Sequence, residues 1–300
     1  MNAYNAEKHV HEAIVSVIGQ TYKNWELIFW DNLSNDKTSE IVKSFKDKRI
    51  KYFKSQVHTT LGPARLSALE KCNGQFVAFL DSDDIWIKNK LELQIPFFND
   101  SDVGIVSSNS EFFNKNGFVR NLYINSFPQN GYVFENLLEN YNLAIETVVL
   151  RMSYIEKLDH SFDQNFHSIL DFDLFIRIAE ISKLYNLREV TAKWRMHEKN
   201  ETFLFPEKFI NEFMLWQKKI INRYPNIIKK YKKSWEKFEN KTKIEHSEYL
   251  LLNNNYKKSN KLIKGIKFYN YKSFLIYLSS LVPFGKYLYK LIIIIKRKIK

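Results

Sequence analysis

One stretch decides the interpretation of the chain: Gln75-Phe76-Val77-Ala78-Phe79-Leu80-Asp81-Ser82-Asp83-Asp84-Ile85-Trp86. Five apolar residues, Phe76 to Leu80, are followed at once by three carboxylates within four positions. This pattern predicts a buried strand that ends in a charge cluster. Because side chains alternate along a strand, Asp81 and Asp83 point the same way if the chain stays extended. A solvated Asp-rich turn is an equally good reading of this stretch alone.

The chemistry of two neighbouring carboxylates favours a cation between them. Asp81 and Asp83 would repel each other on one side of a strand unless a positive charge offsets them. Oxygen ligands suit a hard divalent ion such as Mg²⁺ or Mn²⁺, which takes further ligands from water and substrate phosphates. The stretch therefore leads to the hypothesis of a metal–diphosphate site at the carboxyl end of a strand.

Helical and strand patterns alternate on both sides of this stretch. The expected helices cover residues 6–20, 37–45, 62–72 and 170–181, and the expected strands 25–30, 50–53, 76–80, 103–107, 144–150 and 184–187. Such alternation predicts an α/β fold with a parallel sheet, in which ligands bind outside the carboxyl ends of the strands. The acidic loop that begins at Asp31 would lie on the same edge as Asp81, which favours a site over a simple turn.

Composition separates the chain into two parts. Its 300 residues with 45% hydrophobic content are enough for real cores, and a single cysteine, Cys72, suits a reducing compartment. The start has no basic-then-apolar leader, so secretion is not expected. From Pro206 to Lys300 there are 23 Lys and Arg against 6 Asp and Glu, so the basic character belongs to the last third.

The last third, residues 206–300, reads as a basic helical appendage. Its apolar runs, 273–285 and 291–295, are too short to span a bilayer, which needs roughly 20 apolar residues. Apolar side chains beside Lys286, Lys290 and the terminal basic cluster suit an interfacial helix on an anionic membrane surface. The alternative is a helix that packs on the domain with a solvated basic face.

Several familiar sites are missing. No G-x-G or P-loop spacing occurs, so a glycine-rich phosphate cradle is not expected, and neither zinc spacings nor a G-x-S-x-G elbow is present. Phosphates would have to be neutralised by a metal and by basic side chains.

Five motifs occur in order and cover residues 1 to about 200: Tyr4-Asn5-Ala6-Glu7, Gln20-Thr21-Tyr22-Lys23-Asn24-Trp25-Glu26-Leu27, Asp31-Asn32-Leu33-Ser34-Asn35-Asp36, Ala78-Phe79-Leu80-Asp81-Ser82-Asp83-Asp84 and Leu170-Asp171-Phe172-Asp173-Leu174. Together these motifs resemble family 2 glycosyltransferases with the GT-A fold. The resemblance implies a GT-A domain over residues 1–205 with a mixed, mainly parallel central sheet, followed by the helical region 206–300. It also implies inverting transfer of a sugar from a nucleotide-diphosphate donor, expected to be a UDP-sugar, to a cell-surface glycan or a lipid-linked acceptor.

The resemblance implies roles for individual residues. Asp171 matches the general base that deprotonates the acceptor hydroxyl. The residues that match nucleotide-sugar contacts are Tyr4, Asp31, Arg65, Asp81 and Ser82. Asp83 matches the principal ligand of a Mg²⁺ or Mn²⁺ ion, with Asp81 beside it, and His197 matches a residue near the diphosphate and the metal.

The chain departs from the family pattern at three places. Asn32 and Leu170 stand where many relatives carry a second acid and a glutamate, respectively. Relatives also begin with an apolar strand, whereas Met1 lies at about that strand's last residue, so the first strand is expected to be truncated. The corresponding hypothesis is that the true start lies upstream and Met1 is internal.

Other classes of protein remain as alternatives. A catalytically silent nucleotide-sugar or polyanion-binding protein would share the same motifs. A nucleic-acid-binding tail is a third reading, but no recognised motif supports it and no nucleic acid is expected. The leading prediction is a cytoplasmic enzyme, peripheral on the inner face of the cell membrane.

Overall fold

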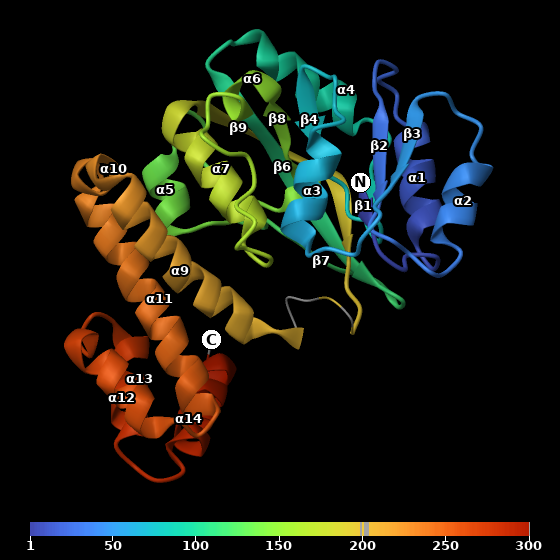
Figure 1. Ribbon diagram of the computed structural model, residues 1–300. Coiled ribbons are helices and arrows are strands. Elements are labelled where there is room, and N and C mark those ends of the chain that lie inside the picture. Colours follow the sequence, from blue (N-terminus) through green and yellow to red (C-terminus); the bar gives the residue numbers. More distant parts are fainter. Residues whose placement is uncertain (199, 201–203, 300) are drawn as a thin grey trace. The chain divides into compact units, whose positions relative to one another are not determined.

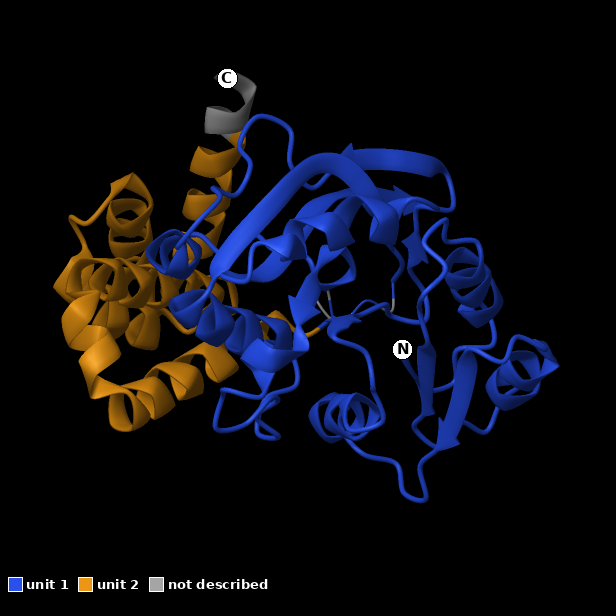
Figure 2. Cartoon of the chain, turned by 90° about the horizontal axis from the view of Figure 1, so that it is seen from above, with its two compact units in different colours: residues 1–204 blue, residues 205–300 orange. Residues whose placement is uncertain are grey.

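The computed structural model describes residues 1–198, 200 and 204–299, and side chains as far as Ile294. The chain divides into two compact units, Met1–Leu204 and Phe205–Lys300, which are coloured separately in Figure 2. Each unit is described by itself below.

The first unit begins with a small parallel sheet. Its strands are β1 (Asn2–Ala3), β2 (Leu27–Asp31) and β3 (Ile50–Lys54), in the order β1-β2-β3. Helices α1 (Val10–Ile18) and α2 (Thr38–Ser44) connect these strands, and α3 (Leu61–Leu69) follows them (Figure 1). Ala3 lies opposite Asp31 in the register, so the loops that follow β1 and β2 leave the same edge of the sheet.

The second sheet is mainly antiparallel. It runs in the order β4 (Phe76–Ala78), β8 (Val149–Arg151), β6 (Val103–Asn114), β9 (Lys183–Arg195) and β5 (Ile85–Trp86), and β7 (Gly117–Asn121) also pairs with β6. Only β6 and β9 pair in parallel there. The expected mixed α/β architecture is confirmed, but the expectation of a mainly parallel sheet holds only for the first sheet. Of the antiparallel pairs, β6–β7 is a hairpin, whereas β4–β8, β6–β8 and β5–β9 join strands that are not consecutive in the sequence.

The remaining elements of the first unit are short, apart from one helix. They are α4 (Lys90–Gln94), η1 (Ile95–Asn99), α5 (Phe134–Glu139), η2 (Ile145–Thr147), α6 (Met152–Ile155) and α7 (Leu170–Ile181). The bounds of α7 are those predicted from the sequence. The strand predicted over residues 144–150 is wrong in its first half, because η2 occupies that part and β8 starts only at Val149.

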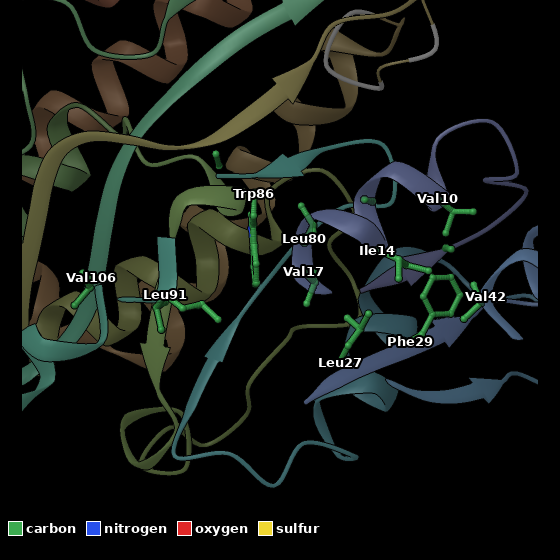
Figure 3. Close-up of a cluster of buried hydrophobic side chains, with 14 of the residues drawn as sticks. Val10, Ile14, Val17, Leu27, Phe29, Val42, Leu80, Trp86, Leu91 and Val106 are labelled. Carbon is green, nitrogen blue, oxygen red and sulfur yellow. The ribbon is translucent and has the colours of Figure 1, made fainter. Parts of the chain in front are cut away.

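A hydrophobic cluster joins the two sheets of the first unit. Val10, Ile14 and Val17 of α1 pack in the same cluster as Phe29 of β2 and Trp86 of β5 (Figure 3). The α1 positions follow the i, i+4, i+7 spacing of one helical face. Burying each large apolar side chain contributes about 1.5–3 kcal/mol, so this core holds the carboxyl ends of β2 and β4 in fixed positions.

The second unit is helical, as expected. Its helices are α9 (Pro206–Arg223), α10 (Pro225–Lys230), α11 (Lys232–Leu252), α12 (Tyr256–Ile263), η3 (Lys264–Ile266), α13 (Tyr271–Ser280) and α14 (Gly285–Ile299). Trp216 of α9 packs on Trp235 and Phe238 of α11, and a second cluster around Leu251, Ile276 and Tyr289 joins α11 to α13 and α14. No helix in the described part of the chain is both long and apolar enough to cross a membrane.

Candidate active site

Asp31 ends β2 and is fully buried. Its Oδ1 accepts a hydrogen bond from the backbone N–H of Ser34 at 2.8 Å, and its Oδ2 accepts one from the hydroxyl of Tyr52 at 2.6 Å. Burial, together with this bond to Asp31, raises the pKa of Tyr52 to about 12, so the hydroxyl stays a donor. The carboxylate is therefore held in one orientation at the carboxyl edge of the first sheet.

Tyr4 lies next to Asp31 because the loops after β1 and β2 are joined by hydrogen bonds. Asn5, in the left-handed region at φ 51°, donates its N–H to Ser34 Oγ at 3.0 Å. Tyr4 is 49% exposed, and the centroid of its ring lies 4.0 Å from the centroid of the His58 ring. His58 was not predicted. Its Nδ1 lies 3.0 Å from the carbonyl oxygen of Asn32, which only accepts, so Nδ1 carries the proton. Two exposed aromatic rings thus lie beside a fixed carboxylate.

Arg65 and Asp81 form the centre of a second group. The Arg65 guanidinium donates to Asp81 Oδ1 at 3.0 Å; the arginine side chain is 7% exposed, whereas the aspartate side chain is 40% exposed. Arg65 comes from α3 and Asp81 follows β4, so the pair links the helix after the first sheet to the turn after a strand of the second sheet. The partly exposed carboxylate keeps an open side that a ligand can approach.

The turn after β4 separates the three carboxylates that the sequence places together. Asp83 Oδ2 lies 2.8 Å from His197 Nε2, and Ser82 is partly buried between Asp81 and Asp83. Asp84 is only 2% exposed, and its Oδ1 accepts the backbone N–H of Arg195 at 2.8 Å. Burial raises the pKa of Asp84 well above its usual value. Asp84 is therefore an internal anchor of the turn.

Arg195 fixes the backbone of this turn. Its role was not predicted from the sequence. Its Nε donates to the carbonyl oxygen of Asp83 at 2.7 Å, while its NH2 group forms an ion pair with Glu12 of α1. A sequence signal existed, since Arg195 stands two residues before His197, but nothing in the pattern indicated a backbone contact to Asp83.

The donor set of Asp83 and Asp81 fits a divalent cation. Burial, and then the negative charge of Asp81, raise the pKa of Asp83, while the hydrogen bond with His197 acts in the opposite direction. A cation would relieve the repulsion between the two carboxylates. Within the described residues no three or more His, Cys, Asp or Glu side chains converge on one point, so the protein would supply few ligands. Mg²⁺ sites commonly use one or two carboxylates with substrate phosphates.

Asp171 lies in the first turn of α7, next to Tyr141. Its Oδ2 accepts a hydrogen bond from the Tyr141 hydroxyl at 3.0 Å, and the Tyr141 ring packs edge-on against Phe172 at 5.1 Å. Burial raises the pKa of Asp171, and the nearby positive charge of Arg65 is the largest effect that lowers it. Arg65 therefore acts electrostatically on both Asp81 and Asp171. Tyr141 was not predicted.

The second carboxylate of α7 has a structural role. Asp173 and Arg177 form an ion pair at 2.6 Å with side chains only 4% and 6% exposed. Arg177 also donates to the carbonyl oxygens of His160 and Ser161, each at 2.6 Å. This pair fixes the segment that precedes α7 and, with it, the position of Asp171.

A buried polar layer lies beneath the site. Glu146 is 2% exposed, accepts from Ser110 Oγ at 2.7 Å and receives the Trp86 indole N–H on its backbone carbonyl at 3.1 Å. Burial raises the pKa of Glu146 to about 7, and burial lowers the pKa of Lys90 to about 7. The Lys90 ammonium donates to Thr147 O at 2.9 Å. These groups were missed because hydropathy gives no signal for polar residues that are buried.

The structure thus places the predicted residues in two groups at the carboxyl edges of the strands. Tyr4 and Asp31 form the first, and the other predicted residues form the second: Arg65, Asp81, Ser82, Asp83, Asp171 and His197. The first group offers aromatic and carboxylate contacts, and the second offers a basic side chain, carboxylates and an imidazole.

Comparison with known proteins identifies similar sequences and folds. The sequence pattern of the family described as Glycosyl transferase family 2 matches residues 1–162. The chain is 38% identical over 162 residues to the UDP-Glc:alpha-D-GlcNAc-diphosphoundecaprenol beta-1,3-glucosyltransferase WfgD of Escherichia coli, covering 54% of this chain and 62% of that protein. It is 33% identical over 197 residues to the enzyme of the same description, WfaP, also of Escherichia coli, covering 65% of this chain and 75% of that protein.

A solved structure shares the fold over most of the chain. The crystal structure of S. aureus TarS 1-349 in complex with UDP-GlcNAc superimposes with a TM-score of 0.63 at 18% identity, covering 93% of this chain and 88% of that chain. At this identity the likeness concerns the fold alone. The chain spans 62% of the length of WfgD, the first of the curated relatives above.

Proposed function

The chain belongs to glycosyl transferase family 2, and on this premise we propose that it is an inverting glycosyltransferase that moves a sugar from a nucleotide-diphosphate donor to a hydroxyl group. The proposed donor is a UDP-sugar and the proposed acceptor a lipid-linked or cell-surface glycan. The names of WfgD and WfaP, which describe transfer from UDP-Glc to a diphosphoundecaprenol-linked sugar, support this choice of substrates.

The observation that carries the proposal is the position of Arg65. This buried guanidinium pairs with Asp81 and also acts on the pKa of Asp171. Groups assigned to the donor side and to the acceptor side are therefore within the electrostatic reach of one side chain. A single displacement at a sugar carbon needs this arrangement, with a base on one side and stabilisation of the leaving group on the other.

On the donor side, the exposed Tyr4 and His58 rings offer a stacking surface for a nucleobase, and Asp31 offers acceptor oxygens for its N–H groups. Asp81 and Ser82 would contact the ribose and the phosphates. Both Asp31 oxygens already accept one hydrogen bond, but each carboxylate oxygen can accept a second. Because Asp31 is fully buried, a nucleobase N–H would reach its carboxylate only after the groups that cover it move.

On the acceptor side, Asp171 would remove the proton from the attacking hydroxyl while that oxygen bonds to the anomeric carbon. The raised pKa of Asp171 makes it a stronger base than an exposed aspartate, yet its bond from Tyr141 favours the ionised form. A positioned base typically contributes about 10² to 10⁴ in rate.

We further propose that Asp83 and Asp81 hold Mg²⁺ or Mn²⁺. His197, whose Nε2 lies 2.8 Å from Asp83 Oδ2, does not converge with both carboxylates on one point among the described residues, so it would join the ion only after a rearrangement. Such an ion would supply positive charge to the departing diphosphate. With the ion bound, Arg65 would stay paired with the partly exposed Asp81 and would add its own positive charge on the donor side. The enzyme is proposed to act as a cytoplasmic, peripheral protein at the inner face of the membrane, which its basic C-terminal region contacts.

The test is a thermal-shift screen of nucleotide sugars with Mn²⁺ or Mg²⁺, followed by an assay for release of the nucleoside diphosphate. A donor at 100 times its Kd stabilises the protein by about 2.7 kcal/mol, which raises the Tm of a unit of this size by about 5–10 °C. We expect one nucleotide class to give this shift in the presence of metal.

The controls separate catalysis from binding. Asp171→Asn should keep the thermal shift and lose nucleoside diphosphate release, whereas Glu189→Gln, which removes an exposed carboxylate on β9, should keep both. A donor-dependent shift without any release under any acceptor would favour the alternative of a catalytically silent nucleotide-sugar-binding protein. No shift with any nucleotide sugar would contradict both readings.

A further inference from the structure

The helix α13 exposes an apolar stripe instead of a polar face. It buries Leu275 and Ile276 in the core of the second unit, whereas Tyr271, Phe274 and Leu278 are 51%, 37% and 41% exposed. These three residues follow the i, i+3, i+7 spacing of one helical face. A helix that only packs on its own unit would place polar residues there.

The helix α14 repeats this arrangement. Tyr289 is buried and its hydroxyl donates to Glu248 of α11, which fixes the inner face of the helix. On the outer face Tyr287, Leu288 and Leu291 are 61%, 45% and 55% exposed. Two successive helices therefore each bury one side and expose a second apolar side.

The turn between α13 and α14 also exposes apolar side chains. Leu281 and Phe284 are 55% and 72% exposed, and Phe284 has a φ of 61°. The left-handed region costs a bulky residue about 1–2 kcal/mol. A Cβ on Gly285 would lie 1.7 Å from the carbonyl oxygen of Ser279, so the turn is pressed against the end of α13. The fold thus maintains an exposed phenylalanine in a strained position.

A shallow pocket of about 640 Å³ lies beside this turn. Two lysines line it, Lys257 from α12 and Lys286 from α14, together with Leu281, Phe284 and Tyr287. Ammonium groups next to apolar side chains match a phosphate group attached to acyl chains. The two stripes meet here, because Leu281 continues the stripe of α13 and Tyr287 begins that of α14.

Charge decides which partner fits this face. From Tyr249 to Lys300 the chain has 12 Lys and Arg and no Asp or Glu. A second copy would bring the same positive charge to the contact, which opposes self-association. Nucleic acid would satisfy the charge but would leave the aliphatic Leu278, Leu281 and Leu291 in water. An anionic bilayer satisfies both the positive charge and the apolar stripes.

We propose that the face formed by α13, the 281–284 turn and α14 docks on an anionic phospholipid bilayer. The turn enters the boundary between headgroups and acyl chains, and Lys257 and Lys286 bind a lipid phosphate. This proposal names the residues that would make the membrane contact included in the proposed function, and it rests on that function. Vesicle binding needs neither donor nor metal, so its failure can be distinguished from failure of the transferase assignment.

The experiment measures co-sedimentation of the full chain with phosphatidylcholine vesicles, with and without phosphatidylglycerol. We expect binding only when phosphatidylglycerol is present. Each lysine near an anionic surface contributes about fivefold in partitioning, so the double variant Lys257→Gln, Lys286→Gln should bind about 25-fold more weakly. Phe284→Ser should also weaken binding, by about tenfold or more. Donor affinity, measured by calorimetry without vesicles, should stay unchanged in all variants.

Matched controls come from α9 in the same unit. Lys218→Gln with Lys219→Gln removes two charges, and Ile221→Ser removes a 43% exposed apolar side chain; none of them lies on the proposed face. We expect these controls to bind like the unchanged chain. Equal binding by Phe284→Ser and Ile221→Ser would overturn the proposal. So would equal binding to neutral vesicles, a dimer in light scattering that Phe284→Ser dissociates, or RNA that displaces the vesicles.

Discussion

Removal of the Tyr141 hydroxyl tests the assignment of Asp171 as the base. Tyr141→Phe keeps the ring and its edge-on contact with Phe172 but removes the 3.0 Å hydrogen bond to Asp171. A hydrogen bond to an ionised group contributes about 1.5–3 kcal/mol, and the protonated acid retains part of it. A difference of about 1.4 kcal/mol between the two protonation states corresponds to one pKa unit.

The direction of the expected pKa change follows from which group donates this hydrogen bond. The hydroxyl favours the ionised carboxylate, so its loss raises the pKa of Asp171 above its already raised value. The acid limb of kcat/KM should therefore move up by about one pH unit, with a roughly tenfold lower rate below the limb and little change on the plateau at higher pH.

The assay is the pH dependence of nucleoside diphosphate release at subsaturating donor and acceptor. Tyr123→Phe is the matched control, because that hydroxyl donates to the backbone carbonyl of Asn142 and not to Asp171. An acid limb that stays in place in Tyr141→Phe, or that moves equally in the control, would refute the reasoning that Asp171 titrates in this limb.

Three further changes test other parts of the site. Asp171→Asn should lower turnover by about 10² to 10⁴ while calorimetry shows unchanged donor affinity, and unchanged turnover would remove Asp171 from the role of base. Asp83→Ala should abolish the dependence of donor binding on Mn²⁺ or Mg²⁺ in the same measurement; metal-linked affinity that persists would contradict its role as a ligand. Arg177→Met breaks the buried pair with Asp173 and should lower the free energy of unfolding in urea by about 3–5 kcal/mol, whereas a loss below about 1 kcal/mol would show that the pair is dispensable.

The elements with regular apolar patterns could be predicted from the sequence. The helix α7 was predicted with its observed bounds, because its first-turn acids and its apolar spacing agree with each other. The strand β2 and the loop after it were predicted because Asp31 abruptly ends an apolar run. Topology alone placed Asp31 and Asp81 on one edge, because both follow the carboxyl end of a strand. The other candidate site residues came from the resemblance to family 2 glycosyltransferases.

The centre of the second sheet could not be predicted in the same way. The strand β6 was expected to stop at Ser107, but it continues to Asn114. Its middle residues are polar and buried: Ser107, Ser108, Asn109 and Ser110. Ser107 donates to Asn186 at 2.7 Å, and Ser110 donates to Glu146 at the same distance. Partners this distant in the sequence leave no local pattern.

Within the site, the sequence gives residue types but not their partners. Three adjacent carboxylates cannot be separated by pattern, and only the bond from Arg195 N–H shows that Asp84 faces inward. Tyr141 was missed because it lies 30 positions before Asp171 in a segment without a motif. Contacts between loops depend on how the core orients them, which periodicity does not specify.

The polar residues in the middle of β6 have a consequence for how the protein reaches its fold. The hydroxyls of Ser107 and Ser108 meet Asn186 and Thr191 of β9 only in one alignment of the two strands. A slip by one residue would turn every side chain to the opposite face and bury polar groups without partners, at about 1–3 kcal/mol each. An apolar strand of this length would slide more easily between alignments. The serine hydroxyls thus favour one register of the sheet, and we expect a chain with alanines there to fold more slowly or into mixtures.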